Sequence, residues 1–132
     1  MTMNSIAWEP RFAVGHDSID AQHRFLFELM DKVQTAITRR YTQGDRTTEH
    51  LVGVLADHFR FENTLMRERA YPQEESHRKY HQRMLETVSE VMERWEHGEN
   101  AQLAFDEFLK QWYYHHTSGA DQNLGHWLLT HP

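Results

Sequence analysis

Apolar residues recur at three- and four-residue steps through four stretches of the chain. The first stretch is marked by Ile19, Leu26, Met30, Val33 and Ile37. This period is typical of amphipathic helices that bury one face. The pattern therefore predicts four helices, over residues of about 18–40, 47–69, 73–96 and 101–119.

Cap and turn residues separate these helices. Asp17-Ser18 is a suitable N-cap for the first helix, and Gly44 interrupts the chain after it. Tyr71-Pro72 ends the second helix, because the residue before a proline disfavours the α region. Gly98 and Asn100 mark the last turn. Four helices with short connections predict an all-α, antiparallel up-and-down four-helix bundle.

The first 17 residues show no sustained helical period. We expect an ordered N-terminal arm over about 1–17 and a C-terminal tail over about 120–132. A chain of 132 residues is long enough for one core and too short for two ordinary domains. The sequence therefore predicts a single domain over residues 1–132.

Composition and charge exclude several classes of function. The formal net charge is −6, and no basic stripe accumulates that would bind nucleic acid. No segment approaches the ~18 apolar residues of a membrane span, and we expect a cytoplasmic protein. The chain has no cysteine, so any metal must be held by nitrogen and oxygen. The chain also contains eleven histidines, an unusually high number that needs an explanation.

Two histidine-containing pairs have i,i+4 spacing on apolar helix faces. The pairs are His58 with Glu62 and His77 with His81, while His23 is flanked by Leu26 and Phe27. A single histidine on such a face is usually a satisfied core residue. Several buried imidazoles and carboxylates together are costly unless a charge organises them. More than four ligands exceed one tetrahedral zinc site, so a carboxylate-bridged two-metal cluster, with iron its usual occupant in bundles, fits better.

Four segments carry a resemblance to a known family. They are VGHDSIDAQHRFLF, HFRFENTLM, YPQEESHRKYH and WYYHHTSGAD, and they occur in the family's order, one per predicted helix. The chain resembles the hemerythrins, most closely the single-domain bacteriohemerythrins. The resemblance implies two Fe ions per chain with a bridging oxo or hydroxo group. It implies the ligands His23, His58, Glu62, His77, His81, His116 and Asp121.

The resemblance also implies how these ligands are shared. One iron would take His77, His81 and His116, and the other His23 and His58. Glu62 and Asp121 would bridge both ions, so that the iron with two histidines keeps one position open for dioxygen. Bound oxygen would become a hydroperoxide that hydrogen-bonds to the oxo bridge. We expect its pocket to be lined by Phe59, Trp112, Thr117, Leu26 and Phe27.

Three further expectations concern residues next to these ligands. His116 and Asp121 are five apart, so a regular helix would turn them roughly 140° from each other. We therefore predict an irregular helix between 116 and 121, a π-bulge or a loosened turn at Ser118-Gly119. His115 should point away from the metal face. Asn63, after Glu62, is expected to face outward.

The leading functional hypothesis is reversible dioxygen binding for storage, transport or delivery, without chemical turnover. An oxygen-consuming client protein would then be its partner. Two alternatives stay open. One is a di-iron enzyme that reduces peroxide or nitric oxide, and the other is an oxygen or redox sensor. A ferritin-like oxidase is disfavoured, because its two Glu-x-x-His motifs are matched here only by Glu74-Glu75-Ser76-His77.

Overall fold

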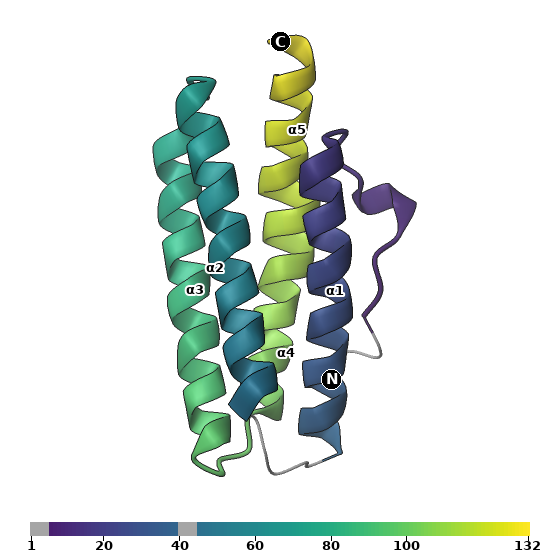
Figure 1. The fold of residues 1–132 in the computed structure, drawn as a ribbon, viewed down its shortest axis with the longest axis vertical. Helices are drawn as coiled ribbons and strands as arrows, with labels where there is room; N and C mark the ends of the chain where they lie inside the picture. Colours follow the sequence, from purple (N-terminus) through teal and green to yellow (C-terminus); the bar gives the residue numbers. More distant parts are fainter. Residues whose placement is uncertain (1–5, 40–44) are drawn as a thin grey trace.

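The fold is a bundle of four helical rods that run alternately up and down (Figure 1). The computed structural model describes residues 6–39 and 45–132, and every regular element in this part is helical. The rods are formed by α1 Asp17–Thr38, α2 Asp45–Glu68, α3 Glu74–Glu96, and a fourth rod of α4 Gln102–Lys110, η2 Gln111–Ala120 and α5 Asp121–Thr130. The predicted antiparallel four-helix bundle is confirmed.

The helix ends follow their local sequence, with one difference from the expected caps. The cap of α1 is His16, whose ring accepts a hydrogen bond from the Ile19 amide, so the helix already begins at Asp17. Two left-handed residues end the middle rods, Ala70 with φ 55° after α2 and Gly98 with φ 83° after α3. Each follows a helix end closed by backbone hydrogen bonds. The turn expected at Gly44 lies outside the described residues.

The fourth rod is longer than the sequence indicated. A tail was expected from residue 120, but α5 continues as helix to Thr130. The expectation was wrong because it stopped at the irregular backbone of η2, beyond which a new apolar face begins. Leu124 and Leu128, four residues apart, are buried on that face. Their burial ties α5 to the rest of the bundle.

The N-terminal arm packs along α1 and against α5. Phe12 lies in the 3₁₀ turn η1 Pro10–Phe12 and stacks on Phe27 with 5.4 Å between ring centroids. The Val14 amide donates to Asp20 Oδ1 at 2.8 Å. At Gly125, a Cβ atom would come within 2.1 Å of the Val14 carbonyl oxygen. Only glycine therefore allows α5 to lie this close to the arm.

The apolar core is divided into two clusters. The larger cluster fills most of the bundle and includes Leu26, Phe27, Phe59 and Trp112. The smaller is formed by Val14, Ile19, Met66, Tyr71, Leu124 and Leu128. The buried imidazoles and carboxylates predicted from the sequence belong to neither cluster. In the described part of the chain, no helix is long and apolar enough to span a membrane.

Candidate metal centre

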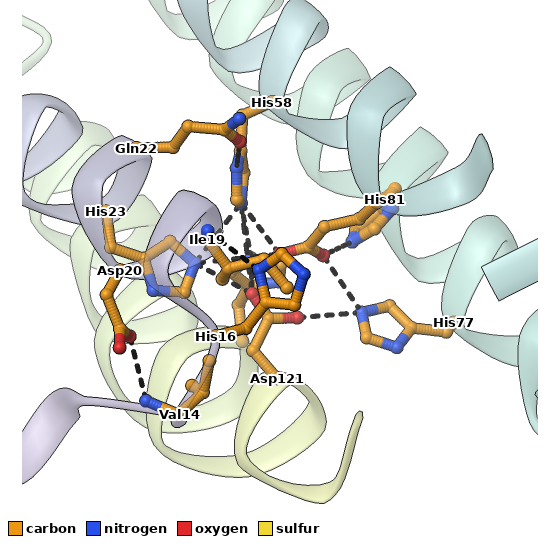
Figure 2. A network of polar contacts seen from close by, with 12 residues as sticks. Val14, His16, Ile19, Asp20, Gln22, His23, His58, His77, His81 and Asp121 are labelled. Atoms are coloured by element: carbon orange, nitrogen blue, oxygen red, sulfur yellow. Dashed lines mark hydrogen bonds and ion pairs between the residues drawn. The ribbon is translucent and has the colours of Figure 1, made fainter. Parts of the chain in front are cut away.

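All seven predicted ligand side chains come together in the bundle interior. Figure 2 labels His23, His58, His77, His81 and Asp121 among them. The first rod supplies His23, the second His58 and Glu62, the third His77 and His81, and the fourth His116 and Asp121. Each is buried, with an exposed fraction of 5% or less. The i,i+4 pairs therefore share a face, as their spacing predicted, and every rod contributes to one cluster.

The two carboxylates lie between the imidazoles and face them with both oxygens. Glu62 Oε1 lies 2.9 Å from His81 Nε2, and Glu62 Oε2 lies 3.0 Å from His58 Nε2. Asp121 Oδ1 lies 3.0 Å from His77 Nε2, whereas Asp121 Oδ2 lies 2.8 Å from His23 Nε2. Each carboxylate thus presents one oxygen to the imidazoles of the first and second rods and the other to those of the third rod.

The ligand atoms form two overlapping groups, each able to hold one ion. The first contains His23, His58, Glu62, His116 and Asp121, and the second contains Glu62, His77, His81, His116 and Asp121. Atoms within a group lie within 4.8 Å of one another. Both groups share Glu62 and Asp121. His116 belongs to both as well, so the division of the imidazoles into three and two stays a prediction.

The irregular helix expected between 116 and 121 is present and extends further. The whole of η2, Gln111–Ala120, is a π-helix, and the Asp121 amide donates to the His116 carbonyl. The wider turn brings His116 Nε2 and Asp121 Oδ2 within 2.8 Å. His115 is exposed, as expected for a residue outside the metal set.

The polar atoms of this cluster fit a cation. Both oxygens of Glu62, Asp121 Oδ1 and the Nε2 atoms of His77 and His81 are buried, with no hydrogen-bond partner among the described residues. Some of these atoms lie about 3 Å apart, yet they are not aligned as hydrogen bonds. Leaving so many buried polar atoms unsatisfied is costly. Metal ions bound among them would satisfy all of them at once.

Burial and the two carboxylates shift the pKa values of the clustered histidines in different directions. Burial opposes protonation of His23, but the neighbouring carboxylates of Asp121 and Glu62 outweigh it and raise the pKa of His23 to about 9. The same two carboxylates raise the pKa of His77 to about 9 against its burial. Burial dominates at His116 and lowers its pKa to about 4. Burial would raise the pKa of Glu62, but its neighbours, above all the imidazole of His58, hold that pKa well below its usual range.

Two amide side chains that were not expected at the site orient the imidazoles. Gln22 Oε1 accepts a hydrogen bond from His58 Nδ1 at 2.7 Å, and Asn63 Oδ1 accepts one from His81 Nδ1 at 2.8 Å. Such bonds fix the tautomer and leave Nε2 free for a metal. The expected outward orientation of Asn63 was wrong, because its side chain reaches across to α3. No spacing rule within one helix reveals these contacts, since each joins two helices.

Aromatic rings cover the imidazoles on their apolar sides. Trp112 stacks on His116 with a centroid distance of 4.7 Å and meets His23 edge-on at 5.3 Å. Phe59 stacks on His81 at 4.2 Å. Of the other expected pocket residues, Phe27 contacts Trp112 edge-on at 6.0 Å, and Leu26 is buried in the larger cluster.

Thr117 differs from these apolar neighbours. Its side chain is fully buried, and its hydroxyl has no hydrogen-bond partner within the described part of the protein. A buried hydroxyl without a partner is unfavourable. Its role as a pocket residue stays a prediction.

The family comparison agrees with this geometry. Residues 14–128 match the model of the hemerythrin HHE cation binding domain, a stretch that contains all seven proposed ligands. The chain belongs to the hemerythrin family. Among curated hemerythrins, it is 30% identical to a bacteriohemerythrin of Stenotrophomonas maltophilia (strain R551-3), over 91% of this chain and 79% of the relative.

Two other relatives show the same extent of similarity. A bacteriohemerythrin of Pseudomonas aeruginosa (strain LESB58) is 28% identical over 90% of this chain and 78% of its own length. A myohemerythrin of Theromyzon tessulatum is 28% identical over 86% of both chains. The hemerythrin similarity thus spans the whole bundle, which makes this chain a bacteriohemerythrin-type single domain.

Proposed function

We propose that the chain binds dioxygen reversibly at a carboxylate-bridged di-iron centre and so carries, stores or delivers oxygen. The observation that carries this proposal is the placement of Glu62 and Asp121, each with one oxygen toward either group of imidazoles. The ligand set supports iron because it is made only of imidazole and carboxylate donors. The names of the curated relatives, bacteriohemerythrin and myohemerythrin, support the same function.

The count of ligands supports an open position at one ion. With the predicted division of the imidazoles into three and two, five imidazoles, two bridging carboxylates and a bridge derived from water would fill six positions on one ion and five on the other. When bound, the iron pair would supply two electrons to oxygen and take them back on release.

In this proposal, the rings of Phe59 and Trp112 keep water away from the metal centre. Phe59 stacks on His81 and Trp112 stacks on His116, so that each ring covers one face of an imidazole. Exclusion of water and acids protects the iron pair from losing its electrons permanently. Gln22 and Asn63 hold two imidazoles in the orientation that coordination needs.

A second candidate is a di-iron enzyme that reduces peroxide or nitric oxide. The observation in its favour is Thr117, a buried hydroxyl without a partner among the described residues, in the same π-helix as His116. A hydroxyl near the open position would donate a hydrogen bond or a proton to a bound substrate. Reversibility distinguishes this candidate from the carrier.

The test is an oxygen cycle. Protein loaded anaerobically with ferrous iron is exposed to oxygen, purged with argon and exposed again. A carrier develops a visible absorption band with oxygen, loses it on purging and repeats this over several cycles. Permanent oxidation on the first exposure, with steady consumption of added reductant, would favour the enzyme.

A further inference from the structure

A pocket of about 520 Å³ opens between α3 and α5. Its volume lies within the range of roughly 300–1,000 Å³ that is typical of small-molecule sites. The pocket reaches His77, which forms part of its lining. It therefore connects the surface of the molecule with one of the proposed iron ligands.

His77 is the most exposed of the seven proposed ligands. Its exposed fraction is 5%, compared with 2% or less for the others. Tyr71 meets the His77 ring at a centroid distance of 6.4 Å, and Trp127 meets Tyr71 at 5.3 Å. A molecule in the pocket would thus be separated from the metal centre by a single imidazole.

The pocket walls are aromatic and its lining carries no lysine, arginine, aspartate or glutamate. Tyr71, Tyr80 and Trp127 provide the rings. The polar lining is supplied by side chains that donate or accept hydrogen bonds without a fixed charge, namely Gln73, Ser76, Asn123 and His126. Such a lining fits a flat, uncharged aromatic molecule with hydroxyl groups better than a phosphate or a carboxylate.

We propose that this pocket binds a neutral aromatic reductant of the quinol class and passes its electrons through His77 to the metal centre. The proposal rests on the function proposed above, since an oxygen carrier whose iron pair becomes diferric must be reduced before it binds oxygen again. One quinol gives one electron to each ferric ion and becomes the quinone. Its two O–H bonds break, and both protons leave to the solvent at the open side of the pocket.

The first test measures binding alone and does not depend on oxygen chemistry. The probe is 2-naphthol, a neutral aromatic alcohol, titrated by calorimetry into the iron-loaded diferric protein. The test variant is Ser76→Phe, which fills the exposed side of the pocket. The matched control is Ser89→Phe, an exposed position on the same helix about 20 Å away along its axis.

We expect one saturable site per chain and a loss of affinity of about tenfold or more in Ser76→Phe, with little change in Ser89→Phe. The second test follows the reduction of the diferric protein by 2-methyl-1,4-naphthoquinol under anaerobic conditions. Its rate should saturate with quinol concentration in the natural protein and in Ser89→Phe, and should fall strongly in Ser76→Phe.

Absence of saturable binding would overturn the proposal, as would equal losses in both variants or a reduction rate that Ser76→Phe leaves unchanged. The oxygen cycle of Ser76→Phe, started from ferrous protein, distinguishes failure of the pocket proposal from failure of the oxygen-carrier proposal. Should quinol reduction depend on Ser76 while the protein fails to bind oxygen reversibly, the carrier is wrong and the reductant pocket stands. Should oxygen bind normally while 2-naphthol does not bind, only the pocket is wrong.

Discussion

The amide of Asp121 donates its hydrogen bond to the carbonyl of His116, five residues earlier in the chain. This π-helical bond turns the two side chains toward the same point, with His116 Nε2 and Asp121 Oδ2 2.8 Å apart. On a regular α-helix they would diverge by roughly 140°. The π-helix therefore lets one rod supply both an imidazole and a carboxylate to the same cluster.

The adjacent histidines of this segment provide a matched pair of variants. Replacing His116 with alanine removes a buried proposed ligand, so we expect the iron content to fall below two per chain and ferrous iron to bind more weakly. Replacing His115, which is exposed, should leave both quantities unchanged. Iron analysis after anaerobic loading and desalting measures the difference. Similar iron contents in the two variants would remove His116 from the ligand set.

The hydrogen bond from His81 to Asn63 should matter for metal affinity. In Asn63→Ala the imidazole loses the acceptor that fixes its tautomer, and we expect iron to bind about 10–100-fold more weakly. Gln82→Ala, a change at an exposed amide on α3, is the control. Competition with a chelator of known affinity measures both. An affinity of Asn63→Ala equal to that of the control would show that this bond does not support the site.

The stability of the metal-free protein should fall as the pH rises above neutral. The folded-state pKa values of His23 and His77 are about 9, above the ordinary value of 6.5, so the folded protein holds more protons than the unfolded chain. Their contribution is complete below pH 6.5 and is lost as the pH rises through 9.

Urea unfolding between pH 7 and 9.5 measures this loss. The iron-loaded protein is the control, because its coordinated imidazoles are neutral ligands over the same range. A metal-free protein whose free energy of unfolding stays constant over this interval would contradict the raised pKa values of His23 and His77.

Thr117 should limit the lifetime of the oxygen-bound protein. Thr117→Val removes the hydroxyl and keeps the shape of the side chain, so we expect slower loss of the oxygen-bound form, by a factor of roughly ten if one hydrogen bond is involved. Thr87→Val, whose hydroxyl donates to the Arg83 carbonyl near the surface, is the control. Decay of the visible absorption band measures the lifetime. An unchanged decay would mean that the Thr117 hydroxyl faces away from oxygen.

Replacing either of two helical glycines with alanine should change the stability of the protein, in opposite directions at the two positions. A Cβ atom at Gly125 would approach the Val14 carbonyl oxygen to 2.1 Å, so Gly125→Ala should destabilise the protein by about 1–3 kcal/mol. A Cβ atom at Gly53 meets no described atom within 4 Å, and Gly53→Ala should stabilise α2 by about 0.5–1 kcal/mol. Urea unfolding compares them. Equal effects would contradict the close contact between α5 and the arm.

Much of the bundle could be predicted because its signals lie within single helices. The apolar period places the rods, and i,i+4 spacing places His58 with Glu62 and His77 with His81 on their buried faces. The spacing of His116 and Asp121 even indicated a local irregularity. Its full length could not be predicted, since no residue type specifies a π-helix in the way that Gly98 specifies a turn.

What the sequence did not reveal depends on contacts between helices. Asn63 looked like an outward residue because only the position of α3 gives its side chain a partner in His81. The tail expected after residue 120 is the helix α5 because Leu124 and Leu128 find a second apolar cluster that includes Val14 and Ile19. In each case the decisive neighbour is distant in sequence.

The central claim is that two iron ions share Glu62 and Asp121 as bridges. Anomalous X-ray diffraction at the iron edge, on crystals of the iron-loaded protein, tests it most directly. We predict two iron peaks, each bonded to one oxygen of both carboxylates, with His77, His81 and His116 on one ion and His23 and His58 on the other. A single peak, or an Asp121 side chain turned away from the iron, would contradict the claim.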